Sequence, residues 1–405
     1  MTTLVPLEIF LTGIVVVLAI LIKYGLTRLK LPSLVGFLLL GFCLRVIGEA
    51  AGFLSEPLLD LFEFLGSIGL FILLFRVGLQ SNLAALLRQL REASAIWIGD
   101  ILVSGTFGFA VARFWLGLEL IPCLFVAAAL TATSVGVSVA VWQEMQALAS
   151  ANGSILIDVA ELDDISGIFL LSLLLTLAPT LHEGAAARSL EVLLGGAAGI
   201  LIVKALAFGL LCVLFSRYAE ESVTTFFRRI KPAPDPMLLV TGTGFIIAAL
   251  AAWLGLSVAV GALFAGLVFS RDPRAVHEEA SFGALYDLFT PFFFIDIGLK
   301  IPPESLTAAV GIGGALLLAA TAGKFLGAGT PTLVLSGWDS AALIGTSMIP
   351  RAEIAMVIIQ QGRELGNWAV PPPVFSGMVL VSAVTCILAP FMLRLLLAKW
   401  PQYPA

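Results

Sequence analysis

The sequence predicts an all-helical protein that crosses a lipid bilayer many times. Apolar residues make up 60% of the 405 residues, charged residues make up only 12%, and the mean hydropathy is +1.06. These values are far from those of soluble globular domains. Apolar runs of roughly 18 residues or more, the length that a helix needs to span a bilayer, recur from end to end. The composition therefore excludes a soluble protein.

About thirteen membrane helices are expected, each close to the roughly 20 residues that a bilayer requires. Clusters of polar residues, glycine and proline separate the apolar runs and mark where each helix ends. The expected ranges are 7–27, 32–50, 57–79, 95–117, 119–142, 153–178, 190–216, 237–254, 257–271, 283–300, 306–335, 340–362 and 372–398.

The longest polar stretch, 217–236, separates a first group of helices (1–216) from a second group (237–405). This stretch is basic, and most loop lysines and arginines fall on the same side of the membrane as it does. Lysine and arginine are enriched in cytoplasmic loops. We therefore expect a multi-pass protein of the cell inner (plasma) membrane, with the N-terminus outside and the C-terminus cytoplasmic. The start of the chain lacks the features of a cleaved signal peptide, so the first helix is expected to be retained.

Two of the expected helices are interrupted at corresponding places. Hydroxyl residues and a glycine break the fifth helix at Leu130–Ser138, and a proline with two charges breaks the twelfth at Ser347–Glu353. Each is the fifth helix of a six-helix unit, counting helices 1–6 and 8–13. Paired interruptions of this kind indicate inverted repeats whose unwound segments line a site near the bilayer midplane.

Three carboxylates, Glu161, Asp163 and Asp164, lie within the expected helix 153–178. An ionised carboxylate in hydrocarbon costs about 2.5 kcal/mol or more, so such acids face a partner, a bound cation or trapped water. Asp163 and Asp164 point about 100° apart around the helix and therefore serve different neighbours. The negative charges of two adjacent carboxylates repel each other, so the pair favours binding of either a proton or a cation, and one can be exchanged for the other. Solvated acids at a helix end are the plainer alternative, although apolar residues continue on both sides.

Lys324 lies near the middle of the expected helix 306–335 and is flanked by glycines that permit close helix approach. A buried ammonium group either pairs with a carboxylate or loses its proton. Pairing with Asp163 or Asp164 is the economical solution, and an ammonium that reaches the membrane interface is the alternative. Lys204 is a rival in the seventh expected helix, but no glycine-rich or broken segment surrounds it.

Thr133 and Ser134 place hydroxyl oxygens beside carbonyl groups freed by an unwound turn, which is the kind of oxygen-rich cage that suits a small alkali cation. Hydroxyls bonded back to their own helix are the alternative. Arg351 and Glu353, next to Pro350, would place charge opposite the ends of the crossing segments and neutralise the helix dipoles. A purely structural role for this pair remains open.

Other embedded charges are less informative. Asp296 lies within an apolar segment and is as readily structural as functional, while Arg76, Asp100 and Asp158 are expected to pair among themselves and stabilise the fold. The four cysteines show no CxxC spacing, so neither a disulfide nor a structural metal is expected. We expect no cofactor, no catalytic site of an enzyme and no nucleic-acid partner.

Taken together, the motifs resemble the bacterial monovalent cation/proton antiporters, of the sodium/proton and Kef-type potassium-efflux kinds. The residues that carry the resemblance are Thr131–Gly136, Asp163–Gly167, Gly255–Gly261 with Ala265–Leu267, Phe292–Gly298, Gly323–Lys324 and Pro350–Glu353. The resemblance covers nearly the whole chain. It implies a thirteen-helix homodimer with a dimerisation domain, a moving core domain, two crossed, half-unwound helices and elevator-type alternating access.

The resemblance also implies roles for single residues. Asp164 would be the chief cation and proton carboxylate, Asp163 would form a salt bridge with Lys324, and Thr133 and Ser134 would lie near the cation. An Asp-Asp pair with a partner lysine resembles the electrogenic members of the family, in which two protons exchange for one sodium ion. We therefore expect electrogenic exchange of Na⁺ for protons.

Some features depart from the family pattern. Leu79–Asn82 is neutral where an acidic motif is usual, and Glu161, Asp158 and Asp296 add carboxylates. Two alternatives stay open: K⁺/H⁺ antiport, and sodium-coupled solute symport by the same fold. A symporter would need a larger cavity and would not need a lysine that exchanges protons. The sequence does not choose between Na⁺ and K⁺.

Overall fold

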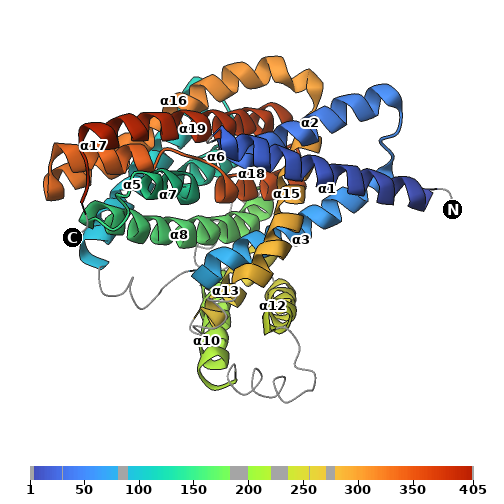
Figure 1. Ribbon diagram of the computed structural model, residues 1–405, viewed down its shortest axis with the longest axis horizontal. Coiled ribbons are helices and arrows are strands. Elements are labelled where there is room, and N and C mark those ends of the chain that lie inside the picture. The colour runs from blue at the N-terminus through green and yellow to red at the C-terminus, as the bar shows by residue number, and fades with distance from the viewer. Residues whose placement is uncertain are drawn as a thin grey trace. The chain divides into compact units, whose positions relative to one another are not determined.

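The computed structural model describes residues 4–29, 31–80, 90–182, 199–219, 236–254, 256–270 and 279–403. All regular secondary structure in these residues is helical (Figure 1). Within this part of the chain, nine helices are long and apolar enough to cross a membrane, and three apolar helices are shorter. The predicted fold class is therefore confirmed, whereas the predicted number of thirteen membrane helices is not.

The helices follow the expected ranges closely. Their bounds are α1 Leu4–Arg28, α2 Ser33–Ala51, α3 Glu56–Gln80, α5 Leu90–Ala110, η1 Val111–Trp115, α6 Leu120–Thr131, α7 Val135–Glu144, α8 Ala151–His182, α10 Gly199–Leu214, η4 Phe215–Ala219, α12 Pro236–Trp253, α13 Val258–Phe269, α15 Glu279–Leu299, η5 Pro303–Ser305, α16 Leu306–Ser336, α17 Trp338–Ser347, α18 Glu353–Leu365 and α19 Pro372–Lys399. Residues 190–198 of the seventh expected helix, and all but the ends of the expected loop 217–236, lie outside the described residues.

Both predicted interruptions are present as breaks in the helices. The chain leaves helical geometry between α6 and α7, where Ala132 has φ −72° and ψ 141°, and again between α17 and α18, where Pro350 and Arg351 are not helical. Pro350 favours the second break, because proline lacks a backbone N–H and disfavours helical geometry in the residue before it. The sequence thus located both unwound segments.

The described chain forms two compact units that interleave along the sequence. The first consists of Met1–Ala19, Ile47–Asn82 and Leu175–Asp296, and the second consists of Ile20–Val46, Leu83–Leu174 and Ile297–Ala405. A compact unit and an inverted repeat are different properties, so the division into two consecutive repeats at 217–236 stays a prediction.

In the first unit, α3 packs along α13, and α13 also packs against α12. The approach of α3 to α13 depends on Gly78 and Gly266, because a Cβ atom on either glycine would meet the backbone of the other helix. Small residues allow helix backbones to approach in this way within a membrane. Phe71 stacks on Phe75 and on Phe245 of α12, which fills the space between these helices.

In the second unit, α16 packs against α5, α17 and α19. Two glycines of α16 set its distance from α5. A Cβ atom on Gly327 would lie 2.9 Å from the Cα atom of Asp100, and one on Gly323 would lie 2.9 Å from the Cα atom of Ser104. Because neither glycine carries a side chain, the backbones of α5 and α16 can come almost into contact. This approach brings Asp100 beside Lys324.

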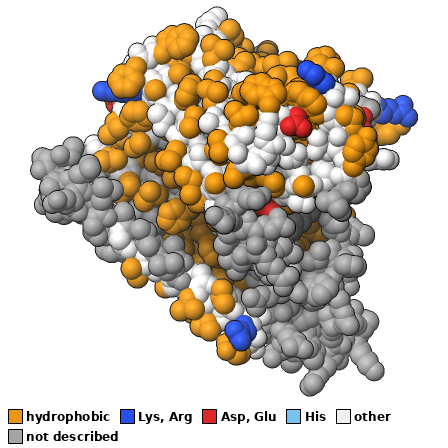
Figure 2. Space-filling model, turned by 90° about the vertical axis from the view of Figure 1, so that its left-hand side faces the viewer, with side chains coloured by type: hydrophobic (Ala, Val, Ile, Leu, Met, Phe, Trp, Pro, Cys, Tyr) orange, Lys and Arg blue, Asp and Glu red, His pale blue; other side chains and the backbone are white. Residues whose placement is uncertain are grey.

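The surface of the described residues is rich in large apolar side chains. Figure 2 shows one face on which hydrophobic side chains outnumber charged ones. Phe114, Trp253 and Val334 are 82%, 84% and 83% exposed. A protein that exposes so large an apolar surface would aggregate in water, whereas the same surface is favourable in contact with lipid tails. The surface therefore agrees with a protein that spans the membrane.

Candidate ion-binding site

The two unwound segments, 132–134 and 348–352, bond to each other in the second compact unit. The backbone N–H of Ser134 donates to the carbonyl oxygen of Pro350 at 2.8 Å, and the Ser138 hydroxyl donates to the carbonyl oxygen of Ser347 at 2.6 Å. The indole N–H of Trp142 donates to the Ser347 hydroxyl at 2.9 Å. Backbone groups freed inside a membrane must find partners within the protein. Here the partners come from the other broken helix.

Buried cations meet the carboxyl end of α6. The Lys324 ammonium donates to the carbonyl oxygen of Thr131, and the Arg351 guanidinium donates to that of Ala132. Both side chains are fully buried. The carbonyl groups at the end of a helix carry partial negative charge, so these cations stabilise the end of α6.

A carboxylate faces the opposite kind of helix end. Glu353 is the first residue of α18, and it accepts a hydrogen bond at 2.7 Å from the hydroxyl of Ser134, the residue that precedes α7. The amino end of a helix carries partial positive charge. Arg351 and Glu353 thus each contact the end of a broken helix, and their role in neutralising the helix dipoles stays a prediction.

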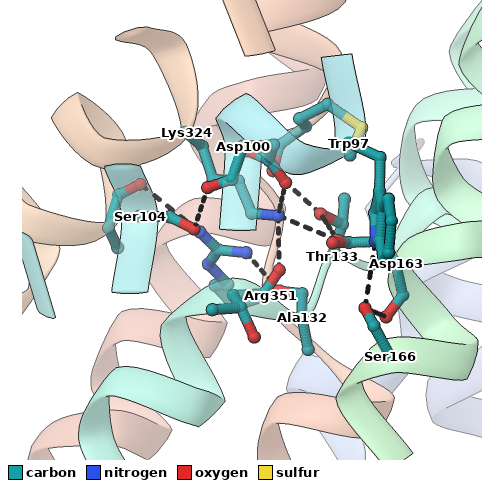
Figure 3. Close-up of polar contacts among 12 residues, drawn as sticks. Trp97, Asp100, Ser104, Ala132, Thr133, Asp163, Ser166, Lys324 and Arg351 are labelled. Carbon is teal, nitrogen blue, oxygen red and sulfur yellow. Dashed lines mark hydrogen bonds and ion pairs between the residues drawn. The ribbon is translucent and has the colours of Figure 1, made fainter. Parts of the chain in front are cut away.

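Lys324 forms ion pairs with two aspartates (Figure 3). Its Nζ atom lies 2.8 Å from Asp163 Oδ2 and also pairs with Asp100 Oδ2. The sequence left Asp163 and Asp164 open as partners of Lys324, and the resemblance to the family implied Asp163. The pairing with Asp100 corrects the expectation that Arg76, Asp100 and Asp158 pair among themselves. All three charged side chains are buried, with at most 1% exposed.

Unused acceptor atoms remain on both aspartates of this cluster. The Thr133 hydroxyl donates to Asp163 Oδ2 at 2.5 Å. In contrast, the Oδ1 atoms of Asp163 and Asp100 are buried and find no hydrogen-bond donor among the described residues. A buried carboxylate oxygen without a partner costs free energy, so each is a favourable position for a proton or a cation.

Asp164 has a different environment from its neighbour Asp163. Its side chain is partly exposed, and none of the described residues forms a hydrogen bond or a salt bridge with it. The helix rotation between adjacent residues explains the difference, because it turns Asp163 toward Lys324 and turns Asp164 away. Among the described residues, Asp164 is therefore the member of the pair that has no protein partner.

The chain that carries this site matches a known family. The family model for the transmembrane part of sodium/hydrogen exchangers matches residues 14–399. The chain belongs to the sodium/hydrogen exchanger family. Both aspartates of the pair, the lysine and both broken helices of this exchanger lie inside the matched range.

Individual relatives are cation antiporters. This exchanger is 29% identical over 353 residues to the high-affinity Na⁺/H⁺ antiporter NhaS3 of Synechocystis sp., with 85% of this chain and 74% of that protein covered. It is 25% identical to the Na⁺/H⁺-K⁺ antiporter GerN of Bacillus cereus, with 91% and 90% covered. It is 22% identical to the K⁺/H⁺ antiporter subunit KhtU of Bacillus subtilis, with 93% and 91% covered.

A solved structure shares the fold. The sodium proton antiporter MjNhaP1 of Methanocaldococcus jannaschii matches with a TM-score of 0.67 over 98% of this exchanger and 97% of that chain. The sequence identity is 18%, so the likeness concerns the fold alone.

Other candidates from the sequence lie elsewhere in this exchanger. Lys204 is exposed on α10, in contrast to the fully buried Lys324. Glu161 is partly exposed on α8, and Asp296 is buried in the first compact unit. Arg76 lies over the ring of Tyr286, 4.3 Å from its centre. In the described part of the chain, none of these four residues forms a salt bridge or a hydrogen bond with Lys324.

Asp100 is the site residue that sequence reasoning missed. The available signal was its position as an acid inside an apolar helix, which it shares with Asp158 and Asp296. Only the packing of α5 on α16 separates Asp100 from these other embedded acids, because it brings the carboxylate to Lys324.

Proposed function

We propose that the protein exchanges Na⁺ for protons across the cell inner membrane, with the C-terminus in the cytoplasm. Membership of the exchanger family supports monovalent cation/proton antiport as the class of reaction. The observation that carries the proposal is the unpaired Asp164 beside the buried ion pair of Asp163 and Lys324. Relatives named as Na⁺/H⁺ antiporters support Na⁺ as the cation.

Exchange follows from competition for the same carboxylate oxygens. Asp164 binds either a proton or a cation, because each neutralises the charge that makes the carboxylate costly in a membrane. The hydroxyl groups of Thr133 and Ser134 donate to Asp163 and Glu353 respectively, and their oxygen atoms keep lone pairs for a cation. A site that cannot hold both ligands couples the outward movement of one to the inward movement of the other.

The proposed movement is an elevator-type displacement of the helices that carry the site. The two broken helices, Asp163, Asp164 and Lys324 all belong to the second compact unit. If the helices that carry these residues move together, the site can pass from one side of the membrane to the other without breaking its ion pairs. We also propose a homodimer, as the resemblance to the family implies.

K⁺ is the second candidate for the cation. Among the relatives, GerN is named as an antiporter of both Na⁺ and K⁺, and KhtU as a subunit of a K⁺/H⁺ antiporter. Electrogenic exchange, which the sequence favoured, would require Lys324 to release a proton in each cycle. A sodium-coupled symporter would not require this buried lysine at all.

The test uses the full chain reconstituted in liposomes that contain a pH-sensitive dye. We expect a proton gradient to collapse on addition of NaCl, to a smaller extent on addition of KCl, and not on addition of choline chloride. Asp164→Asn removes the free carboxylate and should abolish the response. Asp158→Asn, a change at a partly exposed acid of the same helix, is the matched control. Full exchange by the Asp164→Asn variant would refute the proposal.

A further inference from the structure

The helix that carries Asp163 and Asp164 is bonded to its neighbours at a second point besides the ion pair with Lys324. The indole N–H of Trp97, on α5, donates to the hydroxyl oxygen of Ser166, on α8, at 3.1 Å (Figure 3). The Ser166 hydroxyl in turn donates to the backbone carbonyl oxygen of Asp163 at 2.9 Å. An indole can only donate and a serine hydroxyl has a single proton, so the two bonds form a chain from Trp97 to the backbone of Asp163.

We propose that Trp97 is a positioning residue of the exchanger, which acts through Ser166 to fix the rotation of α8 and thereby the direction in which Asp164 presents its carboxylate to the cation. This inference rests on the proposed function, because it concerns the same carboxylates. Neither Trp97 nor Ser166 touches the cation in this scheme. Their role is to hold the oxygen ligands of the cation at fixed distances from each other.

The two attachments lie on one face of α8. Asp163 and Ser166 are three residues apart, so their side chains leave the helix on the same side, one turn from each other. Asp163 pairs with Lys324, and Ser166 accepts from Trp97. A single attachment would let α8 tilt and turn about that point, whereas two attachments on one face hold the helix at one rotation. Because Asp164 follows Asp163 directly, this rotation also sets where its carboxylate points.

Trp97 is itself held firmly enough to serve as the reference for this rotation. Its half-buried ring packs against a buried apolar cluster to which α7, α8, α16, α17 and α19 contribute side chains. One turn further along α5, the backbone of Asp100 lies against Gly327 of α16. The N–H is the one polar group of the ring, and an indole in such surroundings needs a hydrogen-bond acceptor. Ser166 provides it.

The space around this part of α8 is narrow. A Cβ atom on Gly167 would lie 3.0 Å from the Cγ2 atom of Ile354 on α18 and 3.5 Å from the Cβ atom of Ala132 at the unwound turn. Both broken helices therefore lie close to α8 at this position. A change in the rotation of α8 would alter the distance from Asp164 to the hydroxyl of Thr133, which we propose as ligands of the same cation.

A purely structural role for the Trp97–Ser166 bond would have a different consequence. A bond that only held two helices together would affect the stability of the protein, but the folded protein would bind the cation as before. A positioning role instead affects the distances among the oxygen ligands. Ligands bind tightly only when neighbouring groups hold them in the productive geometry. The affinity for the cation therefore separates the two roles.

The experiment measures the KM for Na⁺ and the maximal rate of exchange. The full chain is reconstituted in liposomes that contain a pH-sensitive dye, with Na⁺ as the probe. Trp97→Phe keeps an aromatic ring and removes the N–H donor. We expect its KM for Na⁺ to rise by roughly two- to tenfold, the range that corresponds to the net contribution of one hydrogen bond. The maximal rate at saturating Na⁺ should stay close to that of the wild type.

Matched variants test whether the effect passes through Ser166. Ser166→Ala removes the acceptor and should raise the KM in the same way, whereas Ser166→Thr keeps a hydroxyl and should retain the wild-type KM. The double variant Trp97→Phe with Ser166→Ala should have the same KM as Ser166→Ala alone, because both changes interrupt one chain of bonds.

Trp400→Phe is the control for the loss of an indole. The Trp400 ring packs against the same apolar cluster as Trp97, and among the described residues its indole forms no hydrogen bond. Its KM for Na⁺ should therefore equal that of the wild type.

Cation binding can also be measured without transport. In detergent, NaCl should raise the melting temperature relative to choline chloride, because a ligand stabilises the folded state that binds it. Trp97→Phe and Ser166→Ala should need a Na⁺ concentration higher by roughly two- to tenfold for the same rise.

The possible failures can be told apart. An unchanged KM in folded Trp97→Phe and Ser166→Ala variants overturns the positioning role and leaves the proposed antiport intact. An equal rise of the KM in Trp400→Phe also overturns it, because the effect would then come from the apolar cluster in general. If Trp97→Phe does not fold, Ser166→Ala decides alone, since it is a small change at a half-buried side chain. Absence of any Na⁺-dependent proton movement in the wild type overturns the proposed function itself.

Discussion

At the scale of single residues, the site is a set of buried charges that compensate each other. Lys324 is paired with Asp100 and Asp163, and Arg351 donates to the backbone at the end of α6. The cost of burying a charge falls when it is paired and hydrogen-bonded, and rises steeply when a partner is removed. Each member of the set is therefore also a determinant of stability.

Replacement of Lys324 by alanine should destabilise the protein strongly. The change leaves two buried carboxylates without their counter-ion, and removing one partner of a buried pair costs roughly 3–5 kcal/mol. Lys204→Ala, a change at an exposed lysine, is the control and should have little effect. Thermal unfolding of both variants in detergent measures the difference. Equal melting temperatures for the two would contradict the buried ion pairs.

The backbone of Arg351 is held by three side chains of α19. The hydroxyl of Ser382 and the thiol of Cys386 donate to its carbonyl oxygen, and its N–H donates to the hydroxyl of Thr385. Replacing Thr385 by valine preserves the shape but leaves this buried N–H without an acceptor, which costs about 1–3 kcal/mol. We expect a lower melting temperature and slower exchange from Thr385→Val, and unchanged values for both would contradict the contact.

At the scale of helices, the helix breaks and the glycines of α16 together position the side chains of the site. The breaks supply free carbonyl and hydroxyl groups, and the helix ends that they create are bonded by Arg351, Lys324 and Glu353. The glycines of α16 fix its distance from α5. A broken helix alone would provide oxygen ligands, but it would not bring a second carboxylate to the lysine.

An added methyl group at Gly327 should separate α5 from α16. In Gly327→Ala the new Cβ atom would lie 2.9 Å from the Cα atom of Asp100 and 3.1 Å from its carbonyl oxygen, so the helices must shift. Overpacking of this kind costs about 1–3 kcal/mol. The shift should also weaken the pairing of Asp100 with Lys324, and thermal unfolding and the rate of exchange in liposomes measure the two effects.

Gly314→Ala provides the control on the same helix. Nothing lies within 4 Å of the Cβ position at Gly314, and alanine favours a helix over glycine by up to about 1 kcal/mol. Stability should therefore be unchanged or slightly increased. A loss of stability in Gly314→Ala as large as that in Gly327→Ala would show that the helix contact is not the cause.

At the scale of the whole molecule, the site lies within one compact unit of the chain. The two broken helices and both partners of Lys324 belong to the unit that includes Leu83–Leu174 and Ile297–Ala405. Binding of a ligand to one folded unit stabilises that unit by mass action. Cation binding can therefore be measured as thermal stabilisation, without any transport.

Na⁺ should stabilise the folded protein more at high pH than at low pH. The cation binds the ionised carboxylate of Asp164, and protons compete for the same oxygens as the pH falls. At a concentration of about 100 times its dissociation constant, a ligand contributes about 2.7 kcal/mol. Melting temperatures with NaCl, against choline chloride at the same ionic strength, measure the effect. Asp164→Asn should remove it, and stabilisation that grows toward low pH would contradict the competition.

The sequence by itself determined the membrane-spanning helical class, the positions of both breaks, and the pairing of Lys324 with a carboxylate of the Asp163-Asp164 pair. These features depend on the hydropathy of short segments, on proline geometry and on the cost of a buried charge, all of which are local. Only the tertiary structure decided that Asp100 belongs to the same cluster. Several acids of the chain lie in apolar helices, and the one that reaches Lys324 is selected by the close packing of α5 on α16, two helices far apart in the sequence.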